Sequence, residues 1–204
     1  MNGAHCYWIA GGRVLRDGRL GPELVGEVLA GQARLFAGER FGFGFYRTGS
    51  LDVAFTFDAE RPGLADRVDL RLARGALLAA HAVVGEDRVW LFTAERQGGA
   101  ETLRCRLLDR RGALLASAEE PSTESSWLAA GVGALAAGAV LLVPTDLGVV
   151  RVERDGGALR PTRTFADTAP FVDGATRLLA GQGGLYAVGA ERIHLLRTRQ
   201  ETTP

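Results

Sequence analysis

Short stretches in which apolar and polar residues alternate recur along the whole chain, and many of them end at Gly or Asp. Between residues 82 and 95, an apolar run meets the polar turn Gly85–Arg88, and a second apolar run leaves it. Two short apolar runs joined by a Gly/Asp turn are typical of a β-hairpin. We therefore predict antiparallel strands on both sides of this turn.

The clearest alternation lies between residues 41 and 58. Phe41, Phe43 and Phe45 alternate with glycines, and residues 51–58 then alternate apolar with polar side chains. Because successive side chains of a strand point to opposite faces, the three rings share one face. This region predicts the best antiparallel strand pair of the chain.

Four hairpins of this kind align along the sequence. Their turn glycines recur at intervals of about 40–50 residues, and an Arg-bearing strand follows each hairpin. Such a period, with room for four strands in most of the repeats, is typical of the blade of a β-propeller. The four turn glycines are Gly38, Gly85, Gly138 and Gly181.

In this architecture the chain resembles bacterial β-propeller repeat proteins, over nearly its whole length. It carries no family-specific motif, such as a W-D dipeptide. The resemblance implies an all-β, propeller-like fold of about four blades in a single domain, residues 1–204. The expected units are residues 32–74, 75–120, 121–172 and 173–199, the last together with 5–20.

The last unit contains only three strands, while residues 5–16 form apolar strands without a hairpin of their own type. One expectation is ring closure, in which the N-terminal strand completes the C-terminal blade. The other is an incomplete propeller that a second chain or a missing domain finishes. A β-sandwich is the structural alternative, because irregular repeats of short strands also fit that fold.

Charge and composition exclude several function classes. The formal net charge is zero, so no overall basic field attracts nucleic acid, and we predict no nucleic-acid partner. All 24 basic residues are Arg. A P-loop, Schiff-base chemistry and an S-x-x-K site each need a Lys, and the chain has none.

The two cysteines and one long apolar run indicate in which part of the cell to expect the protein. Cys6 and Cys105 lie far apart in the sequence, which predicts reduced thiols, as in a cytoplasmic protein. Residues 128–143 carry no polar side chain, but the run is short for a membrane span and rich in Gly and Ala. We expect two buried strands with a turn near Gly138, no membrane association and no signal peptide.

Candidate chemistry is sparse. His5 stands beside Cys6, but no second pair lies at metal-ligand spacing. His81 and His194 are single histidines on predicted strands, where a structural role is typical. No G-x-S-x-G motif occurs, so we predict no catalytic residue, no metal and no cofactor.

The use of arginine is unusual in this chain, because arginine supplies every Lys/Arg-type basic side chain. Several arginines fall on or beside the predicted third strands, where they form either a solvated face or an interaction surface. Trp127 follows a polar loop and is a candidate for an exposed aromatic residue at a loop mouth. The candidate binding residues are Arg104, Arg106, Arg110, Arg111, Arg151 and Trp127.

These features predict a non-enzymatic protein-interaction or scaffold domain with a protein partner, either alone or as one module of a larger assembly. The alternative is a carbohydrate-active hydrolase or lyase, which requires two carboxylates facing a central channel. Aspartates available for that role are Asp52, Asp58, Asp87, Asp146, Asp155 and Asp173.

Overall fold

The structure is a computed structural model of the whole chain. It describes the N-terminal strands at residues 7–10, 13–18, 21–27, 34–37, 41–48, 51–58 and 66–68, and then residues 76–122 and 126–196. The fold of these residues is all-β, as predicted, and its helical segments are the 3-10 turns η1 (Gly131–Gly133) and η2 (Ala166–Phe171).

The N-terminal half forms two antiparallel sheets in which each strand pairs with the next along the chain. The first sheet contains β1 (Tyr7–Ala10), β2 (Arg13–Gly18) and β3 (Gly21–Glu27). The second contains β4 (Arg34–Ala37), β5 (Phe41–Thr48), β6 (Leu51–Asp58) and β7 (Asp66–Val68). The predicted pair at 41–58 is confirmed, since β5 and β6 pair over their full lengths.

The centre of the chain forms one eight-stranded sheet from two four-stranded meanders. The first meander contains β8 (Ala76–Val84), β9 (Arg88–Gln97), β10 (Ala100–Asp109) and β11 (Leu114–Pro121). The second contains β12 (Leu135–Ala137), β13 (Val140–Thr145), β14 (Gly148–Asp155) and β15 (Ala158–Phe165). A final sheet contains β16 (Arg177–Gly181), β17 (Gly184–Val188) and β18 (Ile193–Leu196).

The hydrogen bonding therefore does not divide the described strands into four separate blades. The units expected at 75–120 and 121–172 join in one sheet, because β11 and β15 pair in parallel at Ser117 and Ala158. The backbone N–H of Ser117 donates to the carbonyl of Gly157 at 3.0 Å. The edge strands β8 and β12 also contact each other, so this sheet nearly closes on itself.

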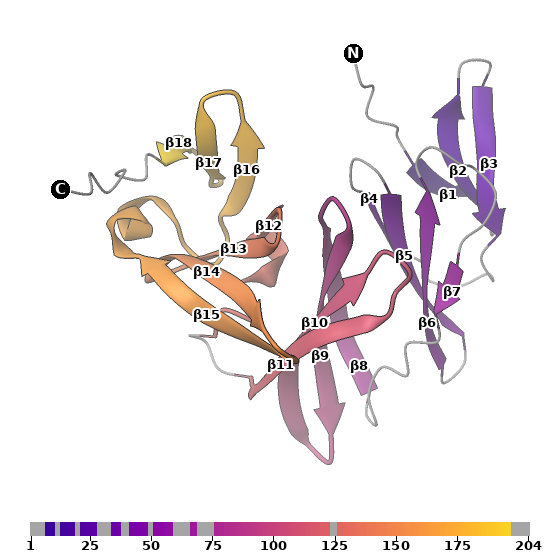
Figure 1. Cartoon of the computed structure of the whole chain (residues 1–204), viewed down its shortest axis with the longest axis horizontal. Coiled ribbons are helices and arrows are strands. Elements are labelled where there is room, and N and C mark those ends of the chain that lie inside the picture. Colours follow the sequence, from indigo (N-terminus) through magenta and orange to yellow (C-terminus); the bar gives the residue numbers. More distant parts are fainter. Residues whose placement is uncertain are drawn as a thin grey trace.

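Ring closure by the N-terminal strand is not found among the described strands. The strands β1–β3 pair with one another, and the sheet of β16–β18 contains no N-terminal strand. β1 instead pairs antiparallel with β2, with Ala10 opposite Arg13. Figure 1 shows these two sheets at opposite ends of an arc of sheets.

Clusters of buried apolar side chains join β5, the two central meanders and the last sheet. The largest cluster lies between β8–β11 and β12–β15 and includes Trp90, Leu107 and Leu141. A second joins β8–β10 to Phe41 and Phe43 of β5, and a third joins β12–β15 to β16–β18. The two central meanders thus each bury a face against the other and against a neighbouring sheet.

The apolar run at 128–143 is partly as expected. The predicted strands and the turn at Gly138 are confirmed by the pairing of β12 with β13. Residues 127–134 instead form a turn and η1, where Gly131 and Gly133 are buried. Within the described part of the chain, no helix has the length and apolarity to cross a membrane.

Candidate functional site

Two of the predicted arginines meet in a network centred on Glu95. The Glu95 carboxylate contacts Arg104 Nη1 at 2.7 Å and Arg106 Nη2 at 3.0 Å. The Thr93 hydroxyl donates to Glu95 Oε1 at 2.7 Å and accepts from Arg106 Nη1 at 3.0 Å. Arg104 also donates two hydrogen bonds to Glu119 on β11. We call these five side chains the Glu95 network.

The Glu95 network lies on the face of β9 and β10 that also carries Val89 and Leu91, since all these positions alternate in phase. The Arg106 side chain is only 10% exposed. Burial lowers the pKa of Arg106, while the attraction of Glu95 and its hydrogen bond raise that pKa again. Arg106 is thus held among buried side chains by Thr93 and Glu95.

The other predicted arginines lie apart from this network. Arg110 and Arg111 are exposed in the β10–β11 turn, where the Arg110 guanidinium lies 6.0 Å from the ring centroid of Phe41. Arg151 on β14 pairs with Glu153, with Nε and Oε1 3.0 Å apart. The structure therefore brings Arg104 and Arg106 together but does not gather the six predicted residues into one surface.

Trp127 is not exposed at a loop mouth. It is 7% exposed, and its ring meets Phe92 edge-on with centroids 6.3 Å apart. The hydroxyl of its neighbour Ser126 holds this segment by donating to Glu120 at 2.6 Å. The large apolar ring is buried because η1 and the preceding turn fold over the β8–β11 sheet.

The remaining histidine and cysteine candidates of the central region lie on separate strands, with His81 on β8 and Cys105 on β10. His81 packs edge-on against Phe36, and burial raises the pKa of the Cys105 thiol well above its usual range. Because the thiolate is the reactive form, Cys105 is an inert core residue. His5 and Cys6 lie outside the described residues. No group of three potential metal ligands occurs in the part of the chain that the structure describes.

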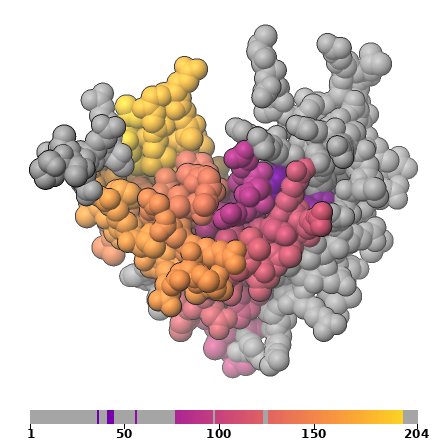
Figure 2. Space-filling view, in the orientation of Figure 1, coloured from indigo at the N-terminus to yellow at the C-terminus, as the bar shows by residue number. Residues whose placement is uncertain are grey.

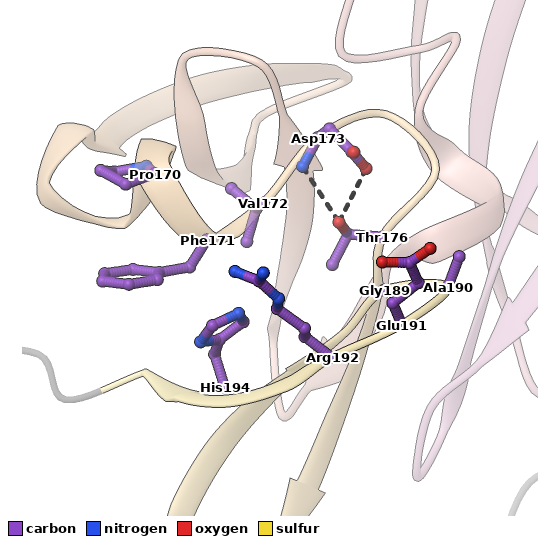
Figure 3. A pocket seen from close by; sticks show the side chains of 10 residues that line it. All are labelled: Pro170, Phe171, Val172, Asp173, Thr176, Gly189, Ala190, Glu191, Arg192 and His194. Atoms are coloured by element: carbon purple, nitrogen blue, oxygen red, sulfur yellow. Dashed lines mark hydrogen bonds between the residues drawn. The ribbon is translucent and has the colours of Figure 1, made fainter.

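A hollow of about 280 Å³ lies between the segment that follows η2 and the last hairpin. Figure 3 shows Phe171 and His194 on one side of it, with Asp173 and Thr176 across from them. The ring centroids of Phe171 and His194 are 5.0 Å apart. The hydrogen bond from Thr176 lowers the pKa of Asp173, which makes that carboxyl a poor general acid.

A second candidate site, besides the hollow, is an exposed apolar face of the C-terminal sheet β16–β18. Leu179, Ile193 and Leu195 are 52%, 70% and 40% exposed. The register of β16–β18 places them on the face that also carries Tyr186 and Val188. We call these five side chains the outer face. In Figure 2 the yellow C-terminal sheet stands at one edge of the molecule.

Sequence reasoning missed both features. The alternation R-I-H-L-L at 192–196 already separates Ile193 and Leu195 from Arg192 and His194. It does not show that the face of Ile193 lacks a neighbouring sheet. It also gives no sign that residues 170–176 lie against the last hairpin.

No protein-family model matches the chain, and neither a curated protein nor a solved structure matches it significantly.

Proposed function

We propose that the chain is a protein-interaction module with a propeller-like architecture, and that it associates through the outer face. The observation that carries this proposal is the exposure of an apolar sheet face at the end of a series of stacked sheets. Single exposed apolar residues are normal on proteins, but a contiguous exposed patch is typical of an interaction site.

The order of the sheets supports a propeller-like arrangement over a β-sandwich. The first strands of successive meanders contact one another in series, from β1 to β4, β8, β12 and β16. A propeller places the first strand of each blade beside that of the next, whereas a sandwich places two sheets face to face. The described sheets form an open arc, which fits one module of a larger assembly (Figure 1).

Both faces of the last sheet carry apolar side chains, but the described residues cover only one of them. Leu178, Ala187 and Leu196 are buried against β12–β15, while Leu179 and Ile193 on the opposite face are exposed. In the central region, each preceding meander buries an apolar face against a neighbouring meander of this chain. A partner that continues the series would present an apolar sheet face of the same kind.

A second copy of the chain is the partner that these observations favour. By register, the outer face carries a single charged residue, Arg177 at its rim, so two such faces can meet without buried like charges. The formal net charge of zero removes long-range repulsion between copies. Most homo-oligomers use such self-complementary faces around a two-fold axis.

Light scattering of the purified chain tests this proposal. The mass should rise with concentration from 21.7 kDa toward twice that value. The double variant Ile193→Glu, Leu195→Glu should remain a monomer, because each copy would bring two charges into the contact. Leu114→Glu, at an exposed apolar residue of β11, is the matched control and should associate like the unmodified chain.

Two results would contradict the proposal. One is an unmodified chain that keeps the monomer mass at every concentration. The other is a double variant that associates as strongly as the unmodified chain. Circular dichroism of each variant distinguishes loss of association from loss of folding.

A further inference from the structure

The hollow beside the last hairpin is a separate feature from the outer face. Its walls come from residues 170–176 on one side and residues 189–194 on the other. Since His194 alternates with Ile193 and Leu195 along β18, it lies on the side opposite the outer face, and Arg192 directly precedes this strand. A ligand in the hollow and a sheet on the outer face would therefore not compete.

One wall is held in place by its own hydrogen bonds. The Thr176 hydroxyl donates to Asp173 Oδ1 at 2.8 Å and accepts from the Asp173 backbone N–H at 3.0 Å. The backbone N–H of Ala175 donates to the same Oδ1 at 2.9 Å, and that of Gly174 reaches Asp146 Oδ1 at 3.2 Å. Two of these bonds, from the Thr176 hydroxyl and the Ala175 N–H, fall on Oδ1 of Asp173 and fix the direction of its carboxylate.

An apolar wall of the hollow takes residues from both of these segments. Phe171 and His194 lie with their rings tilted by 43°, and Pro170 and Val172 extend the same surface. Phe171 remains nearly half exposed although it is a large aromatic residue. Such a wall suits an apolar or aromatic group of a ligand.

Charges of both signs border the hollow. Arg192 makes no ion pair with the residues that the structure describes, and Figure 3 shows its guanidinium directed toward Phe171 and His194. The carboxylates of Asp173 and Glu191 lie on the side away from Phe171 in the same view. A ligand with one charge would meet groups that repel it, whereas a zwitterion can pair with both signs.

We propose that this hollow binds a zwitterionic ligand of amino-acid size with an apolar side chain. The ligand's carboxylate pairs with the guanidinium of Arg192, and its ammonium group pairs with the acidic side at Glu191 and Asp173. Its apolar side chain rests on Phe171 and His194. The volume of about 280 Å³ is at the small end of ligand pockets, which fits a ligand of this size.

Calorimetric titration with three phenyl compounds tests the proposal. L-Phenylalanine carries both charges, 3-phenylpropionate carries the carboxylate alone, and 2-phenylethylamine carries the ammonium group alone. Phenylalanine should bind, and each of the other two should bind at least about tenfold more weakly because one charge-assisted contact is lost.

Variants assign the two contacts. Arg192→Gln should weaken phenylalanine by about tenfold without changing 2-phenylethylamine, and Glu191→Gln should weaken 2-phenylethylamine without changing 3-phenylpropionate. Arg177→Gln, an exposed arginine of the outer face, is the matched control and should bind phenylalanine normally. The variant Ile193→Glu, Leu195→Glu should also keep this binding, so failure of the two proposals can be told apart.

The proposal is overturned if none of the three compounds binds saturably at millimolar concentration. It is equally overturned if a singly charged compound binds as tightly as phenylalanine, or if Arg192→Gln retains the full affinity. Thermal unfolding of each variant shows whether a loss of binding comes with a loss of folding.

Discussion

Trp90 and Ile193 both stand on strands of antiparallel meanders, yet Trp90 is fully buried and Ile193 is 70% exposed. The meander β12–β15 covers Trp90, and it supplies Leu141 and Val143 to the same cluster. No described sheet covers Ile193. The comparison shows that strand alternation assigns a side chain to a face, and that the next sheet decides whether the face is buried.

The covered faces themselves differ in chemistry. The face of β9 that carries Trp90 is apolar, whereas its opposite face carries the Glu95 network beside Val89 and Leu91. Charges are tolerated there because each one is paired and hydrogen-bonded. The outer face offers no such pairing and would be stabilised by an apolar partner.

The largest contrast is expected between a covered and an uncovered leucine. Leu141→Ala should lower the free energy of unfolding by about 2–5 kcal/mol, because it removes a fully buried side chain and leaves a cavity. Leu179→Ala on the outer face should change it by less than about 0.5 kcal/mol. Urea unfolding at low protein concentration measures both. Equal losses would show that the outer face is covered within the monomer.

The Glu95 network should be the next most sensitive feature. Glu95→Gln keeps the shape of the side chain but leaves two arginines without their buried counter-charge, so we expect a loss of about 2–3 kcal/mol. Glu153→Gln removes the partner of Arg151 at a more exposed site and should cost less than about 1 kcal/mol. The same urea titration compares them. A Glu95→Gln variant as stable as Glu153→Gln would assign the network no structural role.

The junction of the last sheet can be tested through a glycine. A Cβ at Gly133 would lie 1.9 Å from the carbonyl oxygen of Thr176, so Gly133→Ala must push the backbone of η1 away from the segment before β16. We expect a loss of about 1–3 kcal/mol. Gly157→Ala, where a Cβ meets nothing within 4 Å, is the control and should leave stability almost unchanged. Similar thermal unfolding of the two variants would contradict this close contact.

The smallest effect concerns acid pH. The hydrogen bond from Thr176 lowers the pKa of Asp173 in the folded chain, so the folded state binds this proton less readily than the unfolded state. The resulting stabilisation is present above the unfolded pKa of about 3.9 and is lost as the pH falls through the folded value. Asp173→Asn should therefore lose slightly less stability than the unmodified chain between pH 6 and pH 3. Identical pH profiles would show that this hydrogen bond does not favour the ionised form.

Much of the strand pattern could be predicted, because it depends on neighbours in the sequence. The hairpin around Gly85 forms where expected, with the Gly85 N–H donating to the Arg88 carbonyl at 2.8 Å. Phe41 and Phe43 are buried on one face, as their alternation predicts. The inert character of Cys105 also agrees with a reduced, buried thiol.

The candidate sites could not be predicted in the same way. In the sequence, Arg106 alternates with apolar residues, a pattern that also fits a side chain facing solvent. In the structure, hydrogen bonds to Thr93 and Glu95 of the neighbouring strand β9 hold its guanidinium in a buried position. Trp127 follows a polar loop, but the turn before η1 directs its ring into the hydrophobic core. Both placements depend on segments that are distant in the sequence, because those segments decide whether a side chain is buried.

By itself, the amino-acid sequence determined the all-β class, the hairpin turns at Gly85, Gly138 and Gly181, and the alternation of faces along strands such as β9. These properties follow from backbone sterics and the two-residue period of a strand, which act over a few neighbouring residues. Only the tertiary structure decided that β11 joins β15, that the face of Ile193 stays uncovered, and that Arg192 and Phe171 border one hollow. These depend on how whole sheets stack, because burial is shared between surfaces that the chain brings together only when it folds.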